Sequence, residues 1–501
     1  MGRKIEDVRS RFFYPSIPKP VLTAETPNGE ADVDSGQIKI NPAFIKMLNE
    51  HGVPEEESLD EVLSHEYTHV TRFPGNAGRR MHQYLVTRTI LNSQDLAQNA
   101  VYAFNEAQTN LFVGVDMGNE ATPKVQRVLA RGSRGLNKIL DGLYQEAFEE
   151  DLGVKLNRKD KKLVEQLKEL SFTNQRSEDF NLRHFAELVK SHLKQFKPRS
   201  GSGFLGMFTQ EQIGEGLAQL AQECADKGYS PDQYEQVINE LSPDEPITPG
   251  KGKLRESRNI YLPLARNYAV PIVRRNIIGN GSLRPEEHKP FSTETSFEDL
   301  DPFRSKGILP GITQAWVRKE GETMEQKGIP DSIEVIDNSP SMPNPNESIS
   351  IPVLGGNVIA RAYLLNDRDV TVYSFGSSDY VYGPSRDEEE IGRVLRLHSR
   401  KGGTTFNPAK LEALLKDRKR SFDLSVISDM EIKNLADFIN SIRGIPELHR
   451  VHLFYTNPTK IGYVTNVQKA TKGMPNIGYA QLYSRGDIEK ITLGELKKSL
   501  K

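Results

Sequence analysis

The last third of the chain alternates short apolar segments with helical ones, and this alternation restricts the possible folds more than any other feature. Five segments have the length and apolar content of buried strands: SIEVID, DVTVYSF, LSVIS, RVHLFYT and IGYAQLYS. Helical segments such as NPAKLEALLKD and EIKNLADFINSIR lie between them. Parallel strands need a long crossover connection, which is usually a helix. Residues 331–501 are therefore predicted to form an α/β domain, a doubly wound parallel sheet with helices on both faces.

Oxygen-bearing side chains follow three of these segments. Asp337, Ser339 and Ser341 alternate in DNSPSM, directly after the strand SIEVI. Thr404 lies on the glycine-rich turn KGGTTFNP, and Asp429 ends the strand in SVISDM. Ligand sites in open α/β sheets lie at the carboxyl ends of the strands. Hydroxyls and carboxylates suit Mg²⁺, Mn²⁺ or Ca²⁺ better than zinc, so the sequence predicts a site for a hard divalent cation there.

A second candidate metal site lies near the amino terminus, in SLDEVLSHEYTHVTRFPG at residues 58–75. Ser58 and Glu61 have the spacing of a capping box, which predicts that a helix begins at Ser58. On such a helix His65 and His69 lie one turn apart on the same face. Two imidazoles in this arrangement can bind one metal ion. The alternative is that both are surface histidines on a packing helix.

A catalytic zinc ion needs a third protein ligand and an open coordination position. The candidate is Glu106 in FNEAQTN, on a predicted helix that spans residues 93–113. Glu66, next to the first histidine, could accept a proton from a zinc-activated water. Asn110, one turn beyond Glu106, could hydrogen-bond the second nitrogen of a ligand histidine. The alternative for Glu106 is a solvent-facing position, because a glutamate on a helix usually faces water.

The sequence as a whole is predicted to divide into three segments. Residues 1–125 contain short strands over 20–41, a helix that begins after Asn41–Pro42, and the two helices above. Residues 126–330 are predicted to be a helical region, which includes a helix over 209–228, followed by a connector rich in proline and glycine. Residues 331–501 form the α/β domain.

Composition narrows the possible partners and compartments. The 501 residues carry a formal net charge of −2, so the overall charge gives no indication of nucleic-acid or membrane binding. The single cysteine, Cys224, excludes an internal disulfide and fits a reducing compartment. The first residues lack the apolar core of a secretory signal, and no segment reaches the ~20 apolar residues of a membrane span. A cytoplasmic location is expected.

The amino-terminal motifs resemble those of the zincin metallopeptidases. A strand, a helix with HEYTH and a later helix with N-E-x-x-x-N are similar to the gluzincin branch, over about residues 20–115. The resemblance implies a zincin-like α+β domain with Glu66 as general base and with zinc ligands His65, His69 and Glu106. Gluzincins usually add a Tyr, His or Arg that stabilises the tetrahedral intermediate. The candidates for this role, among which no spacing selects, are His82, Tyr84 and Tyr144.

The carboxy-terminal motifs resemble the metal-ion-dependent adhesion site (MIDAS) of a von Willebrand factor A (VWA) domain, over about residues 330–501. The resemblance implies that an acidic residue of a protein partner completes the coordination of Mg²⁺. The implied direct ligands are Ser339, Ser341 and Thr404, and the ligands acting partly through water are Asp337 and Asp429. Two residues depart from the family pattern, since Pro340 and Met430 stand where glycine is common. Thr405 is an alternative to Thr404.

A metallopeptidase-like domain followed by a VWA domain resembles a group of prokaryotic proteins that accompany MoxR-type AAA+ ATPases. Two functions follow as expectations. The first is a zinc-dependent peptidase whose VWA domain binds a substrate or partner. The second is a non-proteolytic adaptor that works with such an ATPase. Glu66 favours the first, because a structural zinc site needs no general base.

Overall fold

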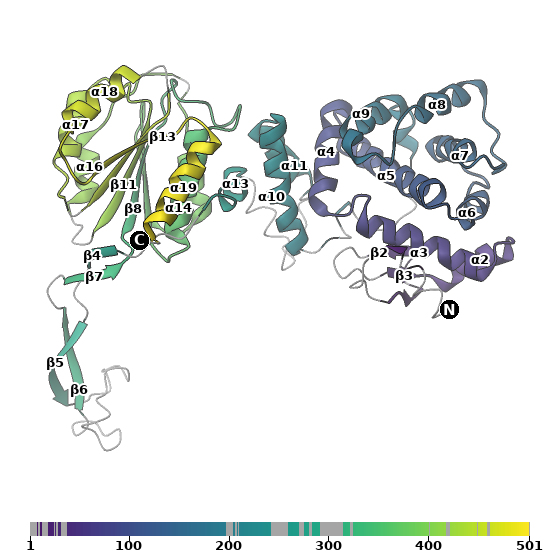
Figure 1. Cartoon of the computed structure of the whole chain (residues 1–501), viewed down its shortest axis with the longest axis horizontal. Coiled ribbons are helices and arrows are strands. Elements are labelled where there is room, and N and C mark those ends of the chain that lie inside the picture. Colours follow the sequence, from purple (N-terminus) through teal and green to yellow (C-terminus); the bar gives the residue numbers. More distant parts are fainter. Residues whose placement is uncertain are drawn as a thin grey trace. The chain divides into compact units, whose positions relative to one another are not determined.

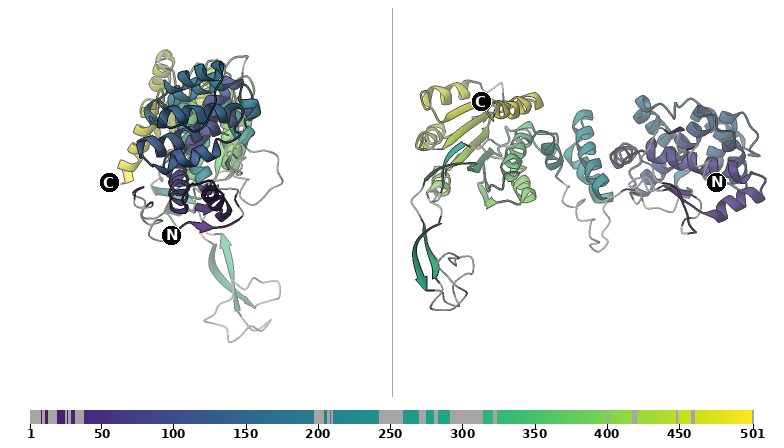
Figure 2. Two further views of the ribbon diagram at one scale, coloured as in Figure 1. Left: turned by 90° about the vertical axis from the view of Figure 1, so that its right-hand side faces the viewer. Right: turned by 60° about the horizontal axis from the view of Figure 1, so that its bottom comes forward.

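The computed structural model shows a mixed α/β protein that divides into two compact units, residues 1–263 and 264–501 (Figures 1 and 2). Each unit is described by itself. The residues that the structure describes are 8, 11–12, 19–24, 26, 29–31, 38–196, 204–205, 208, 210–241, 259–269, 275–279, 283–290, 314–320, 324–399, 401–416, 421–447, 449–457 and 461–499.

The first unit combines a small sheet with many helices. Strands β1 (Val21–Leu22), β2 (Gly29–Ala31) and β3 (Ile38–Ile40) have the order β1-β3-β2, with β1 parallel and β2 antiparallel to β3. The buried isoleucines of β3 pack against apolar side chains of helix α3 (Glu55–Thr71). This contact holds the sheet against the helix that carries both histidines.

Helix α3 begins earlier than the sequence predicted, and the capping-box assignment is wrong. Pro54 precedes the helix, and Glu55 opens a first turn of three acids, which the helix dipole favours. Ser58 lies inside the helix, where its hydroxyl donates to the carbonyl of Val53 at 3.4 Å. Glu61 is buried and accepts a hydrogen bond from another helix.

The two neighbouring predicted helices are confirmed. In α2 (Pro42–Glu50), the side chain of Asn41 accepts a hydrogen bond from the backbone N–H of Ala43, as its capping role requires. In α5 (Gln94–Leu111), Ser93 caps the helix by accepting from the N–H of Leu96. The latter helix places Glu106 beside α3.

Several of the other helices of the first unit contact α5, whose small residues and Phe104 lie in an apolar core of this unit. The predicted helix over 209–228 is confirmed as α10, although its first predicted residue, Thr209, lies outside the described residues. The helices are α4 (Ala77–Leu91), α6 (Ala121–Leu129), α7 (Gly135–Phe148), α8 (Arg158–Lys168), α9 (Glu178–Val189), α10 (Gln210–Lys227) and α11 (Pro231–Leu241), with a π-helical turn, η1 (Phe112–Asp116), and two 3₁₀ turns, η2 (Gln175–Ser177) and η3 (Leu193–Gln195). Helix α13 (Tyr261–Arg266) spans the boundary between the units.

The second unit begins with strands that the sequence analysis did not predict. Strands β4 (Arg275–Gly279) and β7 (Met324–Gly328) form one antiparallel ribbon, and β5 (Leu283–Pro290) and β6 (Gln314–Glu320) form another. The partners are far apart in sequence and their alternation of polar and apolar residues is weak.

A six-stranded sheet follows, and it confirms all five predicted strands. Its order is β10-β9-β8-β11-β12-β13, and every pair is parallel except β10 with β9. The unpredicted edge strand β10 has no buried residue to mark it. The strands are β8 (Asp331–Asp337), β9 (Val370–Phe375), β10 (Tyr380–Ser385), β11 (Phe422–Ser428), β12 (Arg450–Tyr455) and β13 (Ile477–Gln481).

Helices cover both faces of this sheet, with α16, α17 and α18 on one side and α14 and α19 on the other (Figure 1). From the central strand β8 the chain continues to β9 and β10 on one half of the sheet. It then returns to the other central strand, β11, and continues to β12 and β13 on the other half. The crevice of such a sheet lies between these two central strands, at their carboxyl ends. The helices are α14 (Ile351–Leu364), α15 (Glu388–Leu395), α16 (Pro408–Leu415), α17 (Leu435–Arg443), α18 (Ile461–Ala470) and α19 (Arg485–Ser499). Within the part of the chain that the structure describes, no helix combines the length and apolar composition needed to cross a bilayer.

One buried carboxyl in the sheet gives a stability prediction. Glu334 on β8 is fully buried beneath Gly356 of α14, and neither of its oxygens has a hydrogen-bond partner among the described residues. Burial raises its pKa well above the usual value. The folded protein therefore holds a proton that the unfolded chain releases above about pH 4.5, so this residue lowers the free energy of unfolding as pH rises.

We expect Glu334→Leu to stabilise the fold by about 1–3 kcal/mol at pH 8, and by less at pH 5, because an unpaired buried carboxyl is removed. Thermal or urea unfolding at both pH values measures this difference. Glu412→Leu, at an exposed position of α16, is the matched control and should change stability little. A loss of stability at pH 8 in Glu334→Leu would contradict the prediction.

Candidate metal centres

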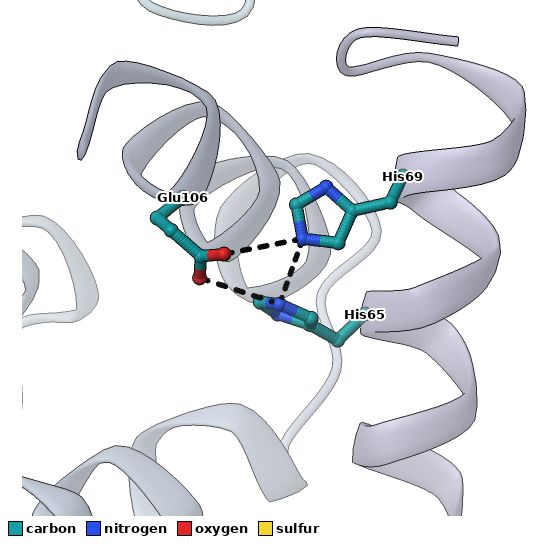
Figure 3. A group of neighbouring side chains, drawn as sticks. All are labelled: His65, His69 and Glu106. Atoms are coloured by element: carbon teal, nitrogen blue, oxygen red, sulfur yellow. Dashed lines mark hydrogen bonds and ion pairs between the residues drawn. The ribbon is translucent and has the colours of Figure 1, made fainter. Parts of the chain in front are cut away.

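Three side chains of the first unit that are distant in sequence converge on one point. His65 and His69 extend from α3, and Glu106 reaches them from the neighbouring helix α5 (Figure 3). The two Nε2 atoms lie 3.1 Å apart. The carboxylate oxygens of Glu106 lie 3.5 Å from Nε2 of His65 and 3.4 Å from Nε2 of His69.

These separations suit a single zinc ion. Ligands of a tetrahedral zinc, each 2.0–2.1 Å from the ion, lie about 3.3 Å from one another. The side chains of His65, His69 and Glu106 are 18%, 10% and 23% exposed, so solvent reaches the cluster. Two imidazoles and a carboxylate are a typical ligand set of catalytic zinc sites, which keep one position open.

The charges in the cluster favour a cation. Burial would lower the pKa of His65, but the hydrogen bond and charge of Glu106 outweigh it and raise the pKa to about 9. Burial would raise the pKa of Glu106, but its hydrogen bonds with both histidines hold it well below the usual value. The carboxylate is therefore ionised at neutral pH and attracts positive charge.

Backbone atoms orient one of the imidazoles. Nδ1 of His69 donates to the carbonyl of Phe73 at 2.7 Å, and this leaves the Nε2 lone pair facing the cluster. The expectation that Asn110 supports a ligand histidine is wrong. Its amide donates to the hydroxyl of Tyr144 at 3.2 Å and accepts from Gln126 at 2.9 Å, because its side chain points toward α6 and α7.

Glu66 lies under the edge strand β2. It is 9% exposed, and a Cβ atom on Gly29 of β2 would lie only 2.8 Å from its Oε1 and 2.9 Å from Cγ1 of Val62. The absence of a side chain at Gly29 therefore leaves room for this carboxylate beside the histidines.

A second buried acid on α3 was assigned only a capping role from the sequence. Glu61 lies one turn before His65 and accepts a hydrogen bond from the hydroxyl of Thr122. Burial raises its pKa to about 7. Its position one turn before a candidate histidine ligand was visible in the sequence, but the burial that shifts its pKa depends on packing against α6.

The structure separates the three candidates for an intermediate-stabilising residue. His82 forms ion pairs with Asp179 at 3.0 Å and Glu223 at 2.9 Å, in a cluster that joins α4, α9 and α10. Tyr84 donates to Glu240 at 2.5 Å. Of the three, Tyr144 alone lines a hollow together with Glu106.

In the second unit, the residues of DNSPSM gather at the carboxyl end of β8. The backbone N–H of Ser339 donates to Asp337 at 2.9 Å, and the hydroxyls of Ser339 and Ser341 lie 3.0 Å apart. Ser428, at the end of the adjacent β11, donates to the other Asp337 oxygen at 2.8 Å. These contacts bring Asp337, Ser339 and Ser341 together at the end of β8, next to Ser428, the residue before the predicted ligand Asp429.

Asp429, directly after β11, is the other candidate acid at this edge of the sheet. Its Oδ1 accepts from the N–H of Glu431 at 2.9 Å, whereas its buried Oδ2 has no hydrogen-bond partner among the described residues. Burial, together with the charge of Asp429, raises the pKa of Asp337 to about 6, despite hydrogen bonds from two serines. Two close carboxylates, one with a free oxygen, fit a hard divalent cation.

The loops at this edge of the sheet contain Met430, which departs from the family pattern, and the two candidate threonines. Met430 adopts a left-handed φ of 62°, the conformation for which glycine is common, and its side chain is buried in the apolar core. Thr404 is buried and its carbonyl accepts from the N–H of Lys433, beyond Asp429. Thr405 is exposed and pairs with Gly376 through its backbone, so Thr404 is the better placed of the two.

Comparison with known proteins adds no further assignment. No protein-family model matches the chain, and no curated protein matches it.

Proposed function

We propose that the first unit is a zinc-dependent metallopeptidase of zincin-like fold and that the second is a VWA domain that binds a protein partner through Mg²⁺. The observation that carries the peptidase proposal is the cluster of His65, His69 and Glu106, whose ligand atoms lie 3.1–3.5 Å apart beside Glu66. A zinc ion would lower the pKa of a water molecule to about 7 and polarise the scissile carbonyl.

Side chains around the cluster would then have separate roles in hydrolysis. Glu66 accepts a proton as the water oxygen attacks the carbonyl carbon. It gives that proton to the amide nitrogen as the C–N bond breaks, so that a carboxylic acid and an amine leave. Tyr144 is the candidate donor toward the developing oxyanion, since it shares a hollow with Glu106.

Metal analysis combined with a cleavage assay tests this function. The purified full-length chain should contain one zinc per molecule and hydrolyse an unfolded protein such as reduced casein. A chelator should stop cleavage, and added zinc should restore it. Full zinc occupancy without hydrolysis of any unfolded substrate would instead favour the adaptor function.

A prediction concerns Gly29 of the edge strand β2, which leaves room for the Glu66 carboxylate. We expect Gly29→Ala to lower kcat at least about tenfold, because the new methyl group displaces the carboxylate, and small displacements of a reacting group are costly. Zinc content should stay at one per molecule, as measured by elemental analysis. Gly142→Ala, whose new methyl group has side-chain atoms of Leu156 as its nearest neighbours, is the control for a general packing effect. Unchanged kcat in Gly29→Ala would contradict the proposed position of Glu66.

For the second unit, the unpaired oxygen of Asp429 beside Asp337 supports a Mg²⁺ or Mn²⁺ site that an acidic partner residue completes. A MoxR-type AAA+ ATPase is the candidate partner that the sequence resemblance suggests. The adaptor function rests on this unit alone.

We expect Asp337→Ala to abolish Mn²⁺ binding by the full-length chain, as measured by electron paramagnetic resonance titration. In the wild type, affinity should fall as pH drops below about 6, because the Asp337 carboxyl then takes up a proton. Asp437→Ala, at an exposed acid on α17, is the control. Equal Mn²⁺ affinity in Asp337→Ala and the wild type would refute this site.

A further inference from the structure

The loop that follows helix α3 supplies the carbonyl that orients one candidate zinc ligand. Phe73 lies four residues beyond His69, and its carbonyl accepts a hydrogen bond from Nδ1 of that imidazole at 2.7 Å. Two backbone bonds shape the loop, from the N–H of Phe73 to Thr68 at 3.1 Å and from the N–H of Gly75 to His69 at 3.2 Å. The position of this carbonyl therefore decides whether Nε2 of His69 faces Glu106 (Figure 3).

Arg79 of helix α4 contacts this loop with two different groups. Its Nη1 donates to the carbonyl of Arg72, and its guanidinium carbon lies 5.3 Å from the centre of the Phe73 ring. A guanidinium is attracted to the face of an aromatic ring. Arg79 thus holds both the residue that carries the orienting carbonyl and the residue before it.

Glu178, the first residue of helix α9, fixes the guanidinium of Arg79 in place. Its carboxylate oxygens accept from Nε of Arg79 at 2.8 and 3.0 Å. The side chains of Arg79 and Glu178 are only 15% and 12% exposed. Separating such a pair would leave uncompensated charge away from water, so the contact resists opening. The partners are 99 residues apart in sequence, and no local motif indicates their contact.

The same carboxylate is connected to the helix of the third candidate ligand. Gln83 of α4 donates to Glu178 at 2.5 Å and exchanges two hydrogen bonds with Asn105, at 2.8 and 3.2 Å. Gln83 and Asn105 are both buried, and Asn105 directly precedes Glu106 on α5. Glu178 therefore links the loop after α3 with the turn of α5 that carries the candidate carboxylate ligand.

We infer that Arg79 and Glu178 are positioning residues of the candidate zinc centre. Arg79 holds the carbonyl of Phe73 against His69, and Glu178 holds Arg79 and, through Gln83, the α5 side of the site. Both act through other residues and not on a metal ion directly. The inference rests on the proposed zinc-dependent function, to which it adds residues of α4 and α9 that the sequence motifs do not include.

Proton exchange at the ring of His69 tests this positioning without any metal. In the metal-free full-length chain with isotope-labelled histidine, NMR identifies the Nδ1 proton of His69 by its loss in His69→Ala. We expect Arg79→Gln to speed the exchange of this proton with water at least about tenfold, because the accepting carbonyl loses the charged group that holds it. A residue with a purely structural role would not alter this rate.

Zinc affinity is the second measurement, by competition with a fluorescent chelator. We expect Arg79→Gln and Glu178→Gln to weaken zinc binding about tenfold, as for residues that orient metal ligands. The matched control is Arg88→Gln on the same helix, since Arg88 binds Glu240 at 2.8–3.0 Å and both side chains are 18% exposed. In urea unfolding the control should lose similar stability, but it should keep the wild-type exchange rate and zinc affinity.

The outcomes separate this inference from the proposed function. Where the wild type binds zinc, faster exchange and weaker binding in Arg79→Gln, with both unchanged in Arg88→Gln, support the inference, and any other result overturns it. Should Arg79→Gln fail to fold, Glu178→Gln takes its place, because it keeps the side-chain volume and removes only the charge. If the wild type binds no zinc, the proposed function fails, and the exchange rates alone decide whether this pair holds the ring of His69.

Discussion

Glu66→Gln is expected to lower peptide hydrolysis by about 10²–10⁴-fold while leaving the zinc content at one per molecule. A positioned general base contributes a rate factor of this size, and glutamine keeps the volume and hydrogen-bonding capacity of glutamate but cannot accept the proton. Glu66 is not among the three side chains of the candidate metal cluster, so under the proposed function its replacement removes a step of the chemistry without removing a ligand. Elemental analysis and initial rates on one preparation measure both quantities.

The control for this experiment is Glu56→Gln, at an exposed acid in the first turn of the same helix. It removes the same charge from α3, so it should leave both the rate and the zinc content unchanged. A Glu66→Gln protein that hydrolyses peptides at the wild-type rate would exclude Glu66 as the base. A protein that loses its zinc would instead assign this residue a role in the metal site.

The sequence predicted local elements well because their signals are local. Asn41 and Ser93 cap helices through side chains two or three residues away from their partners, and the sequence predicted a helix start at each of them. The capping box at Ser58 failed because Pro54 and the acids that follow it start the helix one turn earlier. Both patterns favour a helix start, and only the packed structure decides between them.

The sequence indicated the residues of the candidate zinc site, but it did not indicate the contacts that surround them. The spacing of His65 and His69 fixes their common face, whereas the contact with Glu106 depends on the packing of α5 against α3. The room that Gly29 leaves for Glu66 and the bonds of Asn110 to Tyr144 and Gln126 join segments that are 16 to 37 residues apart. No local pattern in the sequence encodes such contacts.

Removing Glu106 should have the largest effect on the metal. We expect Glu106→Ala to lower zinc affinity at least about a hundredfold, because the proposed ligand set then loses its carboxylate and keeps two neutral imidazoles. His65→Ala should have a similar effect. Asn110→Ala, one turn along the same helix, should keep the affinity of the wild type, since its amide contacts Tyr144 and Gln126 instead. Competition titration with a fluorescent zinc chelator measures all four proteins.

The pH dependence of these titrations tests the cluster independently of affinity. Zinc binding requires a neutral His65, and in the wild type Glu106 raises the pKa of this imidazole to about 9. Wild-type affinity should therefore keep rising between pH 6.5 and about 9, as the proton leaves more easily. In Glu106→Ala the imidazole loses its anionic partner and its pKa falls, so the rise should end at a lower pH. If both proteins show the same pH dependence, Glu106 does not act on these histidines in solution, and the ligand set proposed here is wrong.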